Sequence, residues 1–107
     1  MTYRRRLLPE AEDDIDLVSA YYEEERRGLG ARFVLAAFDA IDECANLPKK
    51  HAFLHDPIRV ARLDRFPFGV LFVLDGSEMV VLAVQDLRRS PRRRVEEALR
   101  RLGGVDD

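Results

Sequence analysis

A tight turn between two apolar segments is the feature that most constrains this sequence. Residues 70–74 and 79–84 are entirely apolar, and Asp75-Gly76 stands between them. An Asp-Gly pair flanked by apolar runs is a strong signal for a β-hairpin, because these residues tolerate the backbone angles of a two-residue turn. Continuous apolar runs are typical of strands buried inside a sheet. The sequence therefore predicts a hairpin at the centre of a β-sheet.

Two amphipathic helices are predicted in the first half of the chain, because apolar residues recur there at helical spacing in two stripes. The first stripe consists of Ala11, Ile15, Val18 and Tyr22. The second consists of Phe33, Ala37, Ala40, Ile41, Cys44 and Leu47. Pro9 suits a first helical position and Pro48 stops the second helix, while Gly28 and Gly30 favour a break between the two. The short link predicts an antiparallel helical hairpin.

The remaining segments complete the order of elements. We expect a strand over residues 3–8, a polar loop over residues 49–57 and a strand over residues 58–64, where apolar and arginine positions alternate. Pro67 and Gly69 predict a turn or bulge, since proline lacks a donor for the sheet. Ser90 and Pro91 supply an N-cap and a first position for a closing helix. The predicted order is β-α-α-β-β-β-α in one domain, residues 1–107.

Composition fits a single folded domain. The chain has 107 residues, of which 47% are hydrophobic and 36% charged, and this is a globular balance. No apolar run approaches the roughly 18 residues of a membrane span, and residues 1–9 carry no signal-peptide core. We therefore expect no membrane association and a cytoplasmic location. Cys44 is the only cysteine, so no internal disulfide is expected, and a lone cysteine on a helix is expected to be buried.

No metal site and no cofactor are expected. His51 and His55, with Asp56 adjacent, lie in the predicted loop, where their spacing does not bring the side chains together. The sequence contains no phosphate loop, dinucleotide fingerprint or nucleophile motif. The N-terminal carboxylates are expected on a solvated helix face, because acidic residues are rarely buried unpaired. These carboxylates are Glu10, Glu12, Asp13, Asp14, Asp16, Glu23, Glu24 and Glu25.

Charge is strongly segregated along the chain, although the net charge is only -2. The acidic N-terminal third contrasts with an arginine-rich C-terminal segment, which contains Arg88, Arg89, Arg92, Arg93, Arg94, Arg100 and Arg101. Cations in the first turn of a helix are disfavoured by the helix dipole, at about 0.3 to 1 kcal/mol each. Helix stability therefore does not account for residues 92–94. Arginine is favoured for recognising phosphate and carboxylate, so this run predicts contact with a partner.

Three further arginines belong to the predicted 58–64 strand and its exit. Strand alternation places Arg59 and Arg65 on one face and Arg62 on the other. These residues are secondary candidates for a basic surface shared with the C-terminal segment. The alternative is a solvated strand edge whose charges discourage aggregation.

Several short motifs follow one another in a characteristic order. They are Leu8-Pro9-Glu10-Ala11-Glu12-Asp13-Asp14-Ile15, then Tyr21-Tyr22-Glu23 with Gly28-Leu29-Gly30-Ala31-Arg32-Phe33, then Arg65-Phe66-Pro67-Phe68-Gly69-Val70, and last Val80-Val81-Leu82-Ala83-Val84 with Arg88-Arg89-Ser90-Pro91. No single motif is specific. The ordered set resembles the ParE/RelE superfamily of toxins from bacterial type II toxin-antitoxin systems, and it is closest to the ParE branch.

The resemblance implies a fold, a target and a partner. The fold of the family is a helical hairpin packed on a twisted antiparallel sheet, an α+β fold. ParE-like members inhibit DNA gyrase and are silenced by a cognate antitoxin whose C-terminal segment wraps the toxin. The resemblance thus implies a plasmid-stabilization toxin that forms a hetero-oligomer with its antitoxin and acts by binding. Target or antitoxin contacts are expected from Arg88, Arg89, Arg92, Arg93 and Arg94.

Two alternative functions accompany this reading. RelE-like members cleave mRNA on the ribosome with basic residues and usually a late aromatic, and here the strand arginines would hold the phosphate. No aromatic residue follows Phe72, and net acidity fits ribosomal RNA poorly. Asp86 and Phe68 replace a common histidine and tyrosine of ParE-like chains, and the second alternative is an inactive homologue kept as an antitoxin-binding partner. The apolar stripes also predict a groove for a partner's amphipathic helix.

Overall fold

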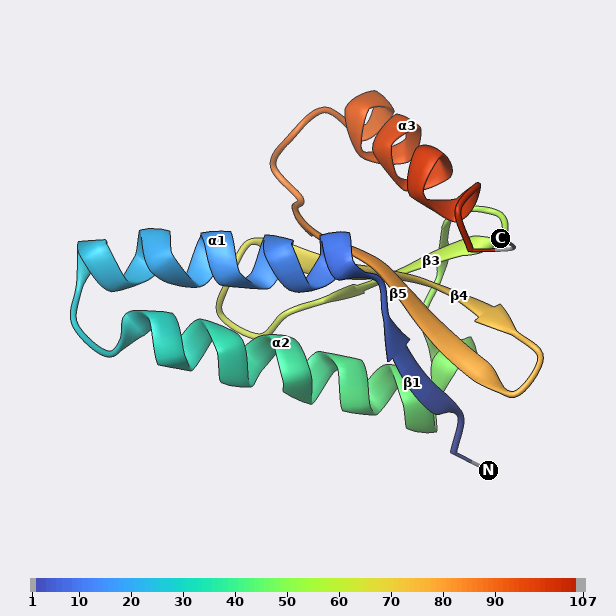
Figure 1. Cartoon of the computed structure of the whole chain (residues 1–107), viewed down its shortest axis with the longest axis horizontal. Coiled ribbons are helices and arrows are strands. Elements are labelled where there is room, and N and C mark those ends of the chain that lie inside the picture. Colours follow the sequence, from blue (N-terminus) through green and yellow to red (C-terminus); the bar gives the residue numbers. More distant parts are fainter. Residues whose placement is uncertain (1, 106–107) are drawn as a thin grey trace.

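The computed structural model describes residues 2–105, which form helices on both faces of one sheet (Figure 1). In chain order the elements are β1 (Arg4–Leu7), α1 (Pro9–Glu25), α2 (Leu29–Asn46), the 3₁₀ turn η1 (Pro48–Lys50), β2 (Phe53–His55), β3 (Ile58–Arg62), β4 (Phe68–Asp75), β5 (Glu78–Asp86) and α3 (Pro91–Leu102). The α+β class and the helical hairpin are confirmed. The predicted order is present with one additional short strand, β2.

The β4–β5 hairpin forms the centre of the sheet, as predicted. The strand order is β1-β5-β4-β3-β2, and Gly76 in the hairpin turn has a φ of 60°. The sheet is mixed, however, because β1 runs parallel to β5 with Arg4 opposite Glu78 and Leu7 opposite Val81. The expectation of an antiparallel sheet was therefore wrong at this edge. Most of the chain separates β1 from β5, so no hairpin turn forces them to be antiparallel.

Residues 49–57 are more regular than the predicted loop. They contain η1 and β2, and Phe53 of β2 pairs with Arg59 of β3. The Arg59 guanidinium lies over the Phe53 ring, 4.0 Å from its centre, and a cation in this position is attracted by the face of the ring. β3 ends at Arg62, two residues before the predicted end at Asp64. The Leu63 N–H donates to the Phe68 carbonyl at 2.9 Å, and this bond closes the turn that leads into β4.

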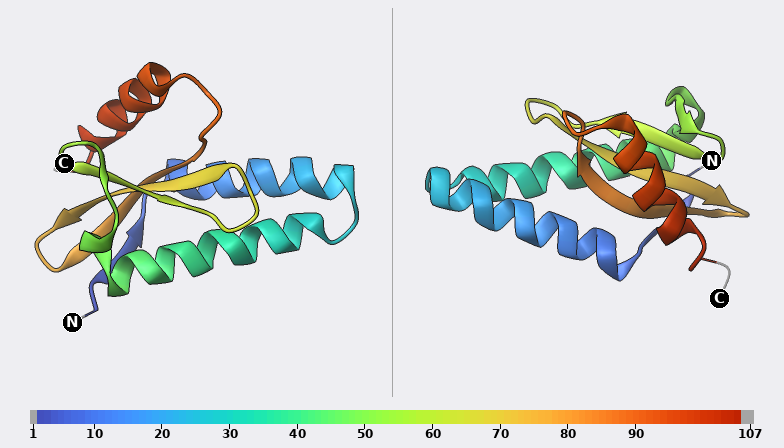
Figure 2. Two further views of the ribbon diagram at one scale, coloured as in Figure 1. Left: turned by 180° about the vertical axis from the view of Figure 1, so that it is seen from behind. Right: turned by 90° about the horizontal axis from the view of Figure 1, so that it is seen from above.

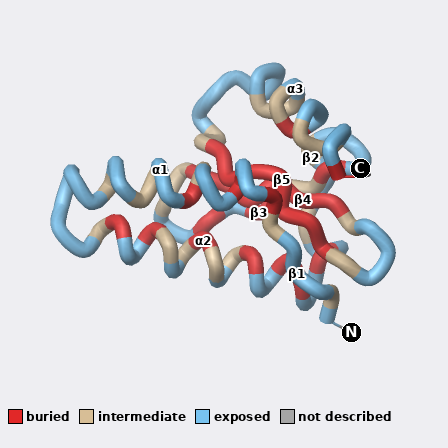
Figure 3. Tube along the Cα trace, viewed as in Figure 1, coloured by how far each residue is buried: buried red, intermediate tan, exposed pale blue. Residues whose placement is uncertain are grey.

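Apolar side chains are buried on both faces of the sheet (Figure 3). One cluster lies between the sheet and the helical hairpin, where Phe33, Ile41 and Phe72 are fully buried. The other lies under α3 and includes Leu82 and Ala98. Figure 2 shows α3 on the side of the sheet opposite the hairpin. The C-terminal segment is therefore part of the folded core.

The link between α1 and α2 is held by the Glu23 carboxylate. Both carboxylate oxygens accept the Gly28 N–H at 3.1 Å, and Oε1 also accepts the Gly30 N–H at 3.1 Å. Gly28 has a φ of 86°, the left-handed conformation predicted for the link. A carboxylate at these amides also complements the positive end of α2.

Cys44 is fully buried on α2, as predicted. Burial raises the pKa of Cys44 to about 12, and the charge of Glu43 adds to this effect. Because the thiolate is the reactive form, we expect the native protein to resist the thiol reagent DTNB at about pH 8 and the urea-unfolded protein to react fully. Rapid labelling of the native protein would contradict this. The raised pKa stabilises the fold below the unfolded value of 9.0, and that contribution is lost as the pH rises towards 12.

Candidate functional site

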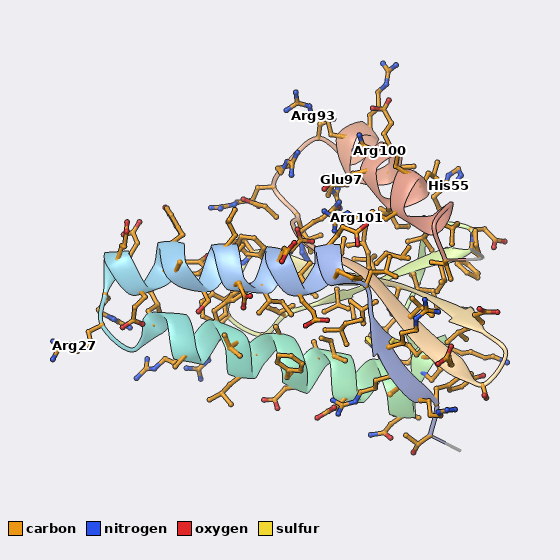
Figure 4. The ribbon with its side chains drawn as sticks, in the orientation of Figure 1. Arg27, His55, Arg93, Glu97, Arg100 and Arg101 are labelled. Atoms are coloured by element: carbon orange, nitrogen blue, oxygen red, sulfur yellow. The ribbon has the colours of Figure 1, made fainter. Side chains whose placement is uncertain are left out.

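Five arginines lie on the segment that leaves β5 and begins α3, and we call this segment the arginine arm. Its arginines are Arg88, Arg89, Arg92, Arg93 and Arg94. Arg94 is partly buried and the other four are exposed. Figure 4 shows Arg93 pointing away from the body of the molecule. The Leu87 N–H donates to the Pro67 carbonyl at 2.9 Å, so the arm begins beside the turn between β3 and β4.

Asp86 fixes the first arginine of the arm. Arg88 Nε donates to Asp86 Oδ1 at 3.0 Å and Nη2 donates to Oδ2 at 2.8 Å. These hydrogen bonds from Arg88 lower the pKa of Asp86, so this carboxylate is ionised at neutral pH. Burial raises the pKa of Tyr22, and the positive charge of Arg88 opposes that shift. The charge of Arg88 therefore acts on the surface around Tyr22.

The first turn of α3 presents its arginines with little restraint. Ser90 is the N-cap residue and Pro91 the first helical residue, as predicted, although the Ser90 side chain makes no capping hydrogen bond. Arg92 Nε lies 3.1 Å from Glu96, and Arg89 Nη1 lies 3.8 Å from Glu97. Exposed ion pairs of this kind contribute about 0 to 1 kcal/mol. A charged partner can therefore displace them at low cost.

Arg101 ties α3 to the rest of the molecule, and its position is labelled in Figure 4. Nη1 donates to Asp14 Oδ2 at 2.7 Å and to the Leu82 carbonyl at 2.9 Å, and Nη2 donates to Asp14 Oδ1 at 3.2 Å and to Glu97 Oε1 at 2.7 Å. Asp14 Oδ2 also accepts the Val84 N–H at 3.0 Å. Burial works to lower the pKa of Arg101, but the hydrogen bonding to Asp14 and the negative charges of Asp14, Glu97 and Glu10 together outweigh it, and the pKa is raised. The expectation that Asp14 lies on a solvated acidic face was therefore wrong.

The three strand arginines do not form one surface. Arg59 is held by Phe53 and donates to the His51 carbonyl at 2.7 Å. Arg62 and Arg65 are exposed at the end of β3 and in the following turn. Arg65 lies beyond the strand with a φ of 69°, so its predicted place on one strand face with Arg59 was wrong. Arg62 and Arg65 instead face a groove beside α2.

A groove of about 750 Å³ lies between the outer face of α2 and the turn from β3 to β4, and we call it the α2 groove. Its apolar lining consists of Tyr22, Leu29, Leu35, Ala36, Ala40, Ala61 and Phe66. Its charged lining consists of Arg26, Arg32, Arg62, Arg65, Asp39, Glu43 and Asp64. Sequence reasoning missed the outer face of α2. The available signal was Leu35, an apolar residue outside the buried stripe that is 65% exposed.

The histidines take separate structural positions. His51 Nε2 lies 3.2 Å from Glu43 Oε1, and its ring stands edge-on to Phe72, while His55 lies on β2. Within residues 2–105, no three side chains of His, Cys, Asp or Glu gather as a metal site requires. No helix in the same range is both long and apolar enough to cross a membrane.

Comparison with known structures bears on the fold. The chain is similar to a chain of the solved structure described as the chromosomal ParDE TA system from P. aeruginosa, where TA stands for toxin-antitoxin. The TM-score is 0.72 at 17% sequence identity, and the match covers 80% of this chain and 97% of that chain. This likeness confirms the fold expected from the resemblance to the ParE branch. No protein-family model matches the sequence, and no curated protein matches it.

Proposed function

We propose that this chain is the toxin of a type II toxin-antitoxin pair, that it binds DNA gyrase through the arginine arm, and that a cognate antitoxin silences it in the cytoplasm. The observation that carries the proposal is the arm itself, in which four exposed arginines occupy one short segment. The shared fold with a chain of a ParDE TA system supports the same assignment.

The arm is suited to binding an acidic surface. Arginine offers several donors in a planar fork that matches carboxylate and phosphate oxygens. The base of the arm is held by Asp86 and Arg101, whereas the ion pairs of Arg89 and Arg92 are exposed and weak. Because the backbone of the arm is held in place while Arg89 and Arg92 can exchange their ion-pair partners, the arm can bind a target without a large rearrangement.

The protonation states of Asp86 and Arg88 suit an ionic contact better than acid-base catalysis by these two groups. General acid catalysis at neutral pH needs a group that holds a proton near that pH. The lowered pKa of Asp86 leaves it ionised, and the hydrogen bond to Asp86 raises the pKa of Arg88 further above neutrality. Both groups are therefore charged at neutral pH, as an ionic contact with a partner requires.

The proposal is tested by the superhelical density of a reporter plasmid after brief induction of the chain without antitoxin. We expect progressive relaxation on a chloroquine gel together with growth arrest. The triple variant Arg88→Ala, Arg89→Ala, Arg92→Ala should leave the plasmid supercoiled, because it removes most of the exposed charge of the arm. The matched control removes three exposed charges elsewhere, with Arg4→Ala, Arg27→Ala and Lys49→Ala, and should relax the plasmid like the parent.

Each other outcome rejects part of the proposal. Relaxation by the triple variant would reject the arm as the gyrase contact. Unchanged topology with cleaved transcripts would reject gyrase in favour of the ribosome-dependent ribonuclease. Unchanged topology and normal growth, together with tight antitoxin binding, would identify an inactive homologue.

A further inference from the structure

We propose that the α2 groove binds a small ligand, a nucleoside triphosphate, with the base on aromatic rings and the phosphates on arginines. The inference does not rest on the proposed function, and it concerns residues outside the arginine arm. It stands on the volume of the groove, its aromatic surface and the uneven distribution of its charges.

The size of the groove fits a small ligand. Its volume of about 750 Å³ lies within the range of roughly 300 to 1,000 Å³ that ligand pockets in proteins occupy. One face of α2 forms a wall of the groove, on which Arg32, Leu35, Ala36, Asp39 and Glu43 recur at a spacing of three or four residues. From Arg32 to Glu43 this wall is about 17 Å long, at about 1.5 Å per residue. An extended nucleotide can therefore lie along it.

Two aromatic rings line the groove, and we call them the aromatic platform. They are Tyr22 and Phe66, and their ring centres lie 5.0 Å apart. Both rings also pack on the fully buried Phe33, with ring centres at 5.6 Å for Tyr22 and 5.3 Å for Phe66. The core therefore holds both rings in place while each remains half-buried at the groove. Such a platform is suited to a nucleobase, since bases stack on aromatic side chains.

Four arginines line the groove near the aromatic platform. They are Arg26, Arg32, Arg62 and Arg65. Within residues 2–105, no carboxylate lies within ion-pair distance of Arg26, Arg32 or Arg62. Arg65 lies 3.9 Å from Asp64, but these side chains are 88% and 92% exposed, and such ion pairs contribute little. Because guanidinium groups bind phosphate oxygens with paired hydrogen bonds, these arginines are suited to a phosphate chain.

Charge is unevenly distributed along the groove. Two of its carboxylates, Asp39 and Glu43, lie about 11 Å and about 17 Å from Arg32 along the axis of α2. The third, Asp64, lies in the turn beside Arg65. The end with the aromatic platform is therefore basic and the far end of α2 is acidic. Phosphates are attracted to the first end and repelled by the second, so one orientation of the ligand is favoured.

The turn that carries Arg65 has an unusual backbone. Its φ of 69° lies in the left-handed region, which is uncommon for residues other than glycine. Conformations of this kind cost energy and cluster at ligand-binding sites. Here Arg65 and the next residue, Phe66, both line the groove although they are adjacent in sequence. The turn thus brings one cation and one aromatic ring to the same ligand.

The test titrates the purified full chain with ATP, AMP and inorganic tripolyphosphate by isothermal titration calorimetry. ATP should bind most tightly. AMP should bind about tenfold less tightly because it lacks two phosphates, and tripolyphosphate about tenfold less tightly because it lacks the stacked base. The absence of ATP binding would overturn the proposal. Equal affinities for ATP and tripolyphosphate would also overturn it, because they would show attraction of any polyanion.

Variants of the lining residues locate the site. The pair Arg32→Ala, Arg62→Ala should weaken ATP binding by about tenfold and AMP binding by less, because AMP carries fewer phosphates. The matched control Arg4→Ala, Arg100→Ala removes two exposed arginines outside the groove and should bind ATP like the parent. Phe66→Leu should weaken ATP and AMP binding equally, since both ligands present the same base. Circular dichroism verifies that each variant is folded. Normal ATP binding by the first pair, or equal loss in the control pair, would overturn the proposal.

Other occupants of the groove give different results. If single-stranded nucleic acid fills it, an oligonucleotide will bind more tightly than ATP and displace it, and the proposal fails. If a second copy of this chain fills it, light scattering will show a dimer and ATP will not bind, and the proposal fails. None of these measurements depends on toxicity or on gyrase, so a negative plasmid experiment and a negative titration reject separate claims.

Discussion

Replacing Arg101 with alanine is expected to lower the free energy of unfolding by about 3 kcal/mol. The guanidinium donates to Asp14, Glu97 and the Leu82 carbonyl, and its side chain is only 14% exposed. The variant leaves the Asp14 carboxylate partly buried without its counter-ion. Domains of this kind are stabilised by about 5 to 15 kcal/mol in total, so the loss should be plain in urea unfolding followed by circular dichroism.

The physical reason is that Arg101 and Asp14 replace a missing strand. β1 pairs with β5 only as far as Leu7 and Val81, whereas β5 continues beyond this point. The Val84 N–H donates to Asp14 and the Leu82 carbonyl accepts from Arg101, so two side chains satisfy the open edge. Buried backbone groups without partners are costly.

Two controls separate this effect from a loss of surface charge. Arg100→Ala removes the exposed neighbour and should change stability by no more than about 0.5 kcal/mol. The double variant Asp14→Leu, Arg101→Met removes both charges and should recover the part of the loss that comes from the unpaired Asp14 carboxylate. It should not recover the part that comes from the Val84 N–H and the Leu82 carbonyl, which still lack partners. Equal stability of Arg101→Ala and Arg100→Ala would show that the hydrogen bonds of Arg101 do not stabilise the fold.

Local signals accounted for most of the fold. The Asp75-Gly76 turn and the apolar runs beside it predicted the central hairpin, and two apolar stripes with a glycine link predicted the helical hairpin. These features act between residues close in sequence. The parallel pairing of β1 was not predictable in this way, because its partner β5 lies at the other end of the chain. β2 was missed because three residues in a polar segment form a strand only through contacts with β3.

The candidate site was predictable in part, for a similar reason. The arginine run identified the arm, since arginines in a first helical turn oppose the helix dipole. Arg59 is held by the Phe53 ring of the neighbouring strand, and Arg62 is the last residue of β3. The alternation of side chains along one strand predicts neither the neighbouring ring nor the end of the strand. Asp14 has the sequence pattern of a solvated helix residue, and its partner Arg101 lies near the other end of the chain, so local sequence does not predict their contact.

Phe33→Ala is expected to destabilise the fold by about 4 kcal/mol, because removing a large buried side chain costs both its burial and a cavity. Phe33 is fully buried, and its ring centre lies 5.6 Å from Tyr22 and 5.3 Å from both Phe66 and Phe68. Aromatic pairs at such distances add about 0.5 to 1.5 kcal/mol beyond burial. Urea unfolding measures the loss, and a cost below about 1 kcal/mol would show that this aromatic cluster does not hold the hairpin to the sheet.

Leu35→Ala provides the matched comparison on the same helix. Leu35 faces the α2 groove instead of the core, so its truncation should leave stability within about 0.5 kcal/mol of the parent. A large loss of stability with Phe33→Ala and none with Leu35→Ala would therefore show that the inner face of α2 holds the hairpin to the sheet and that its outer face does not.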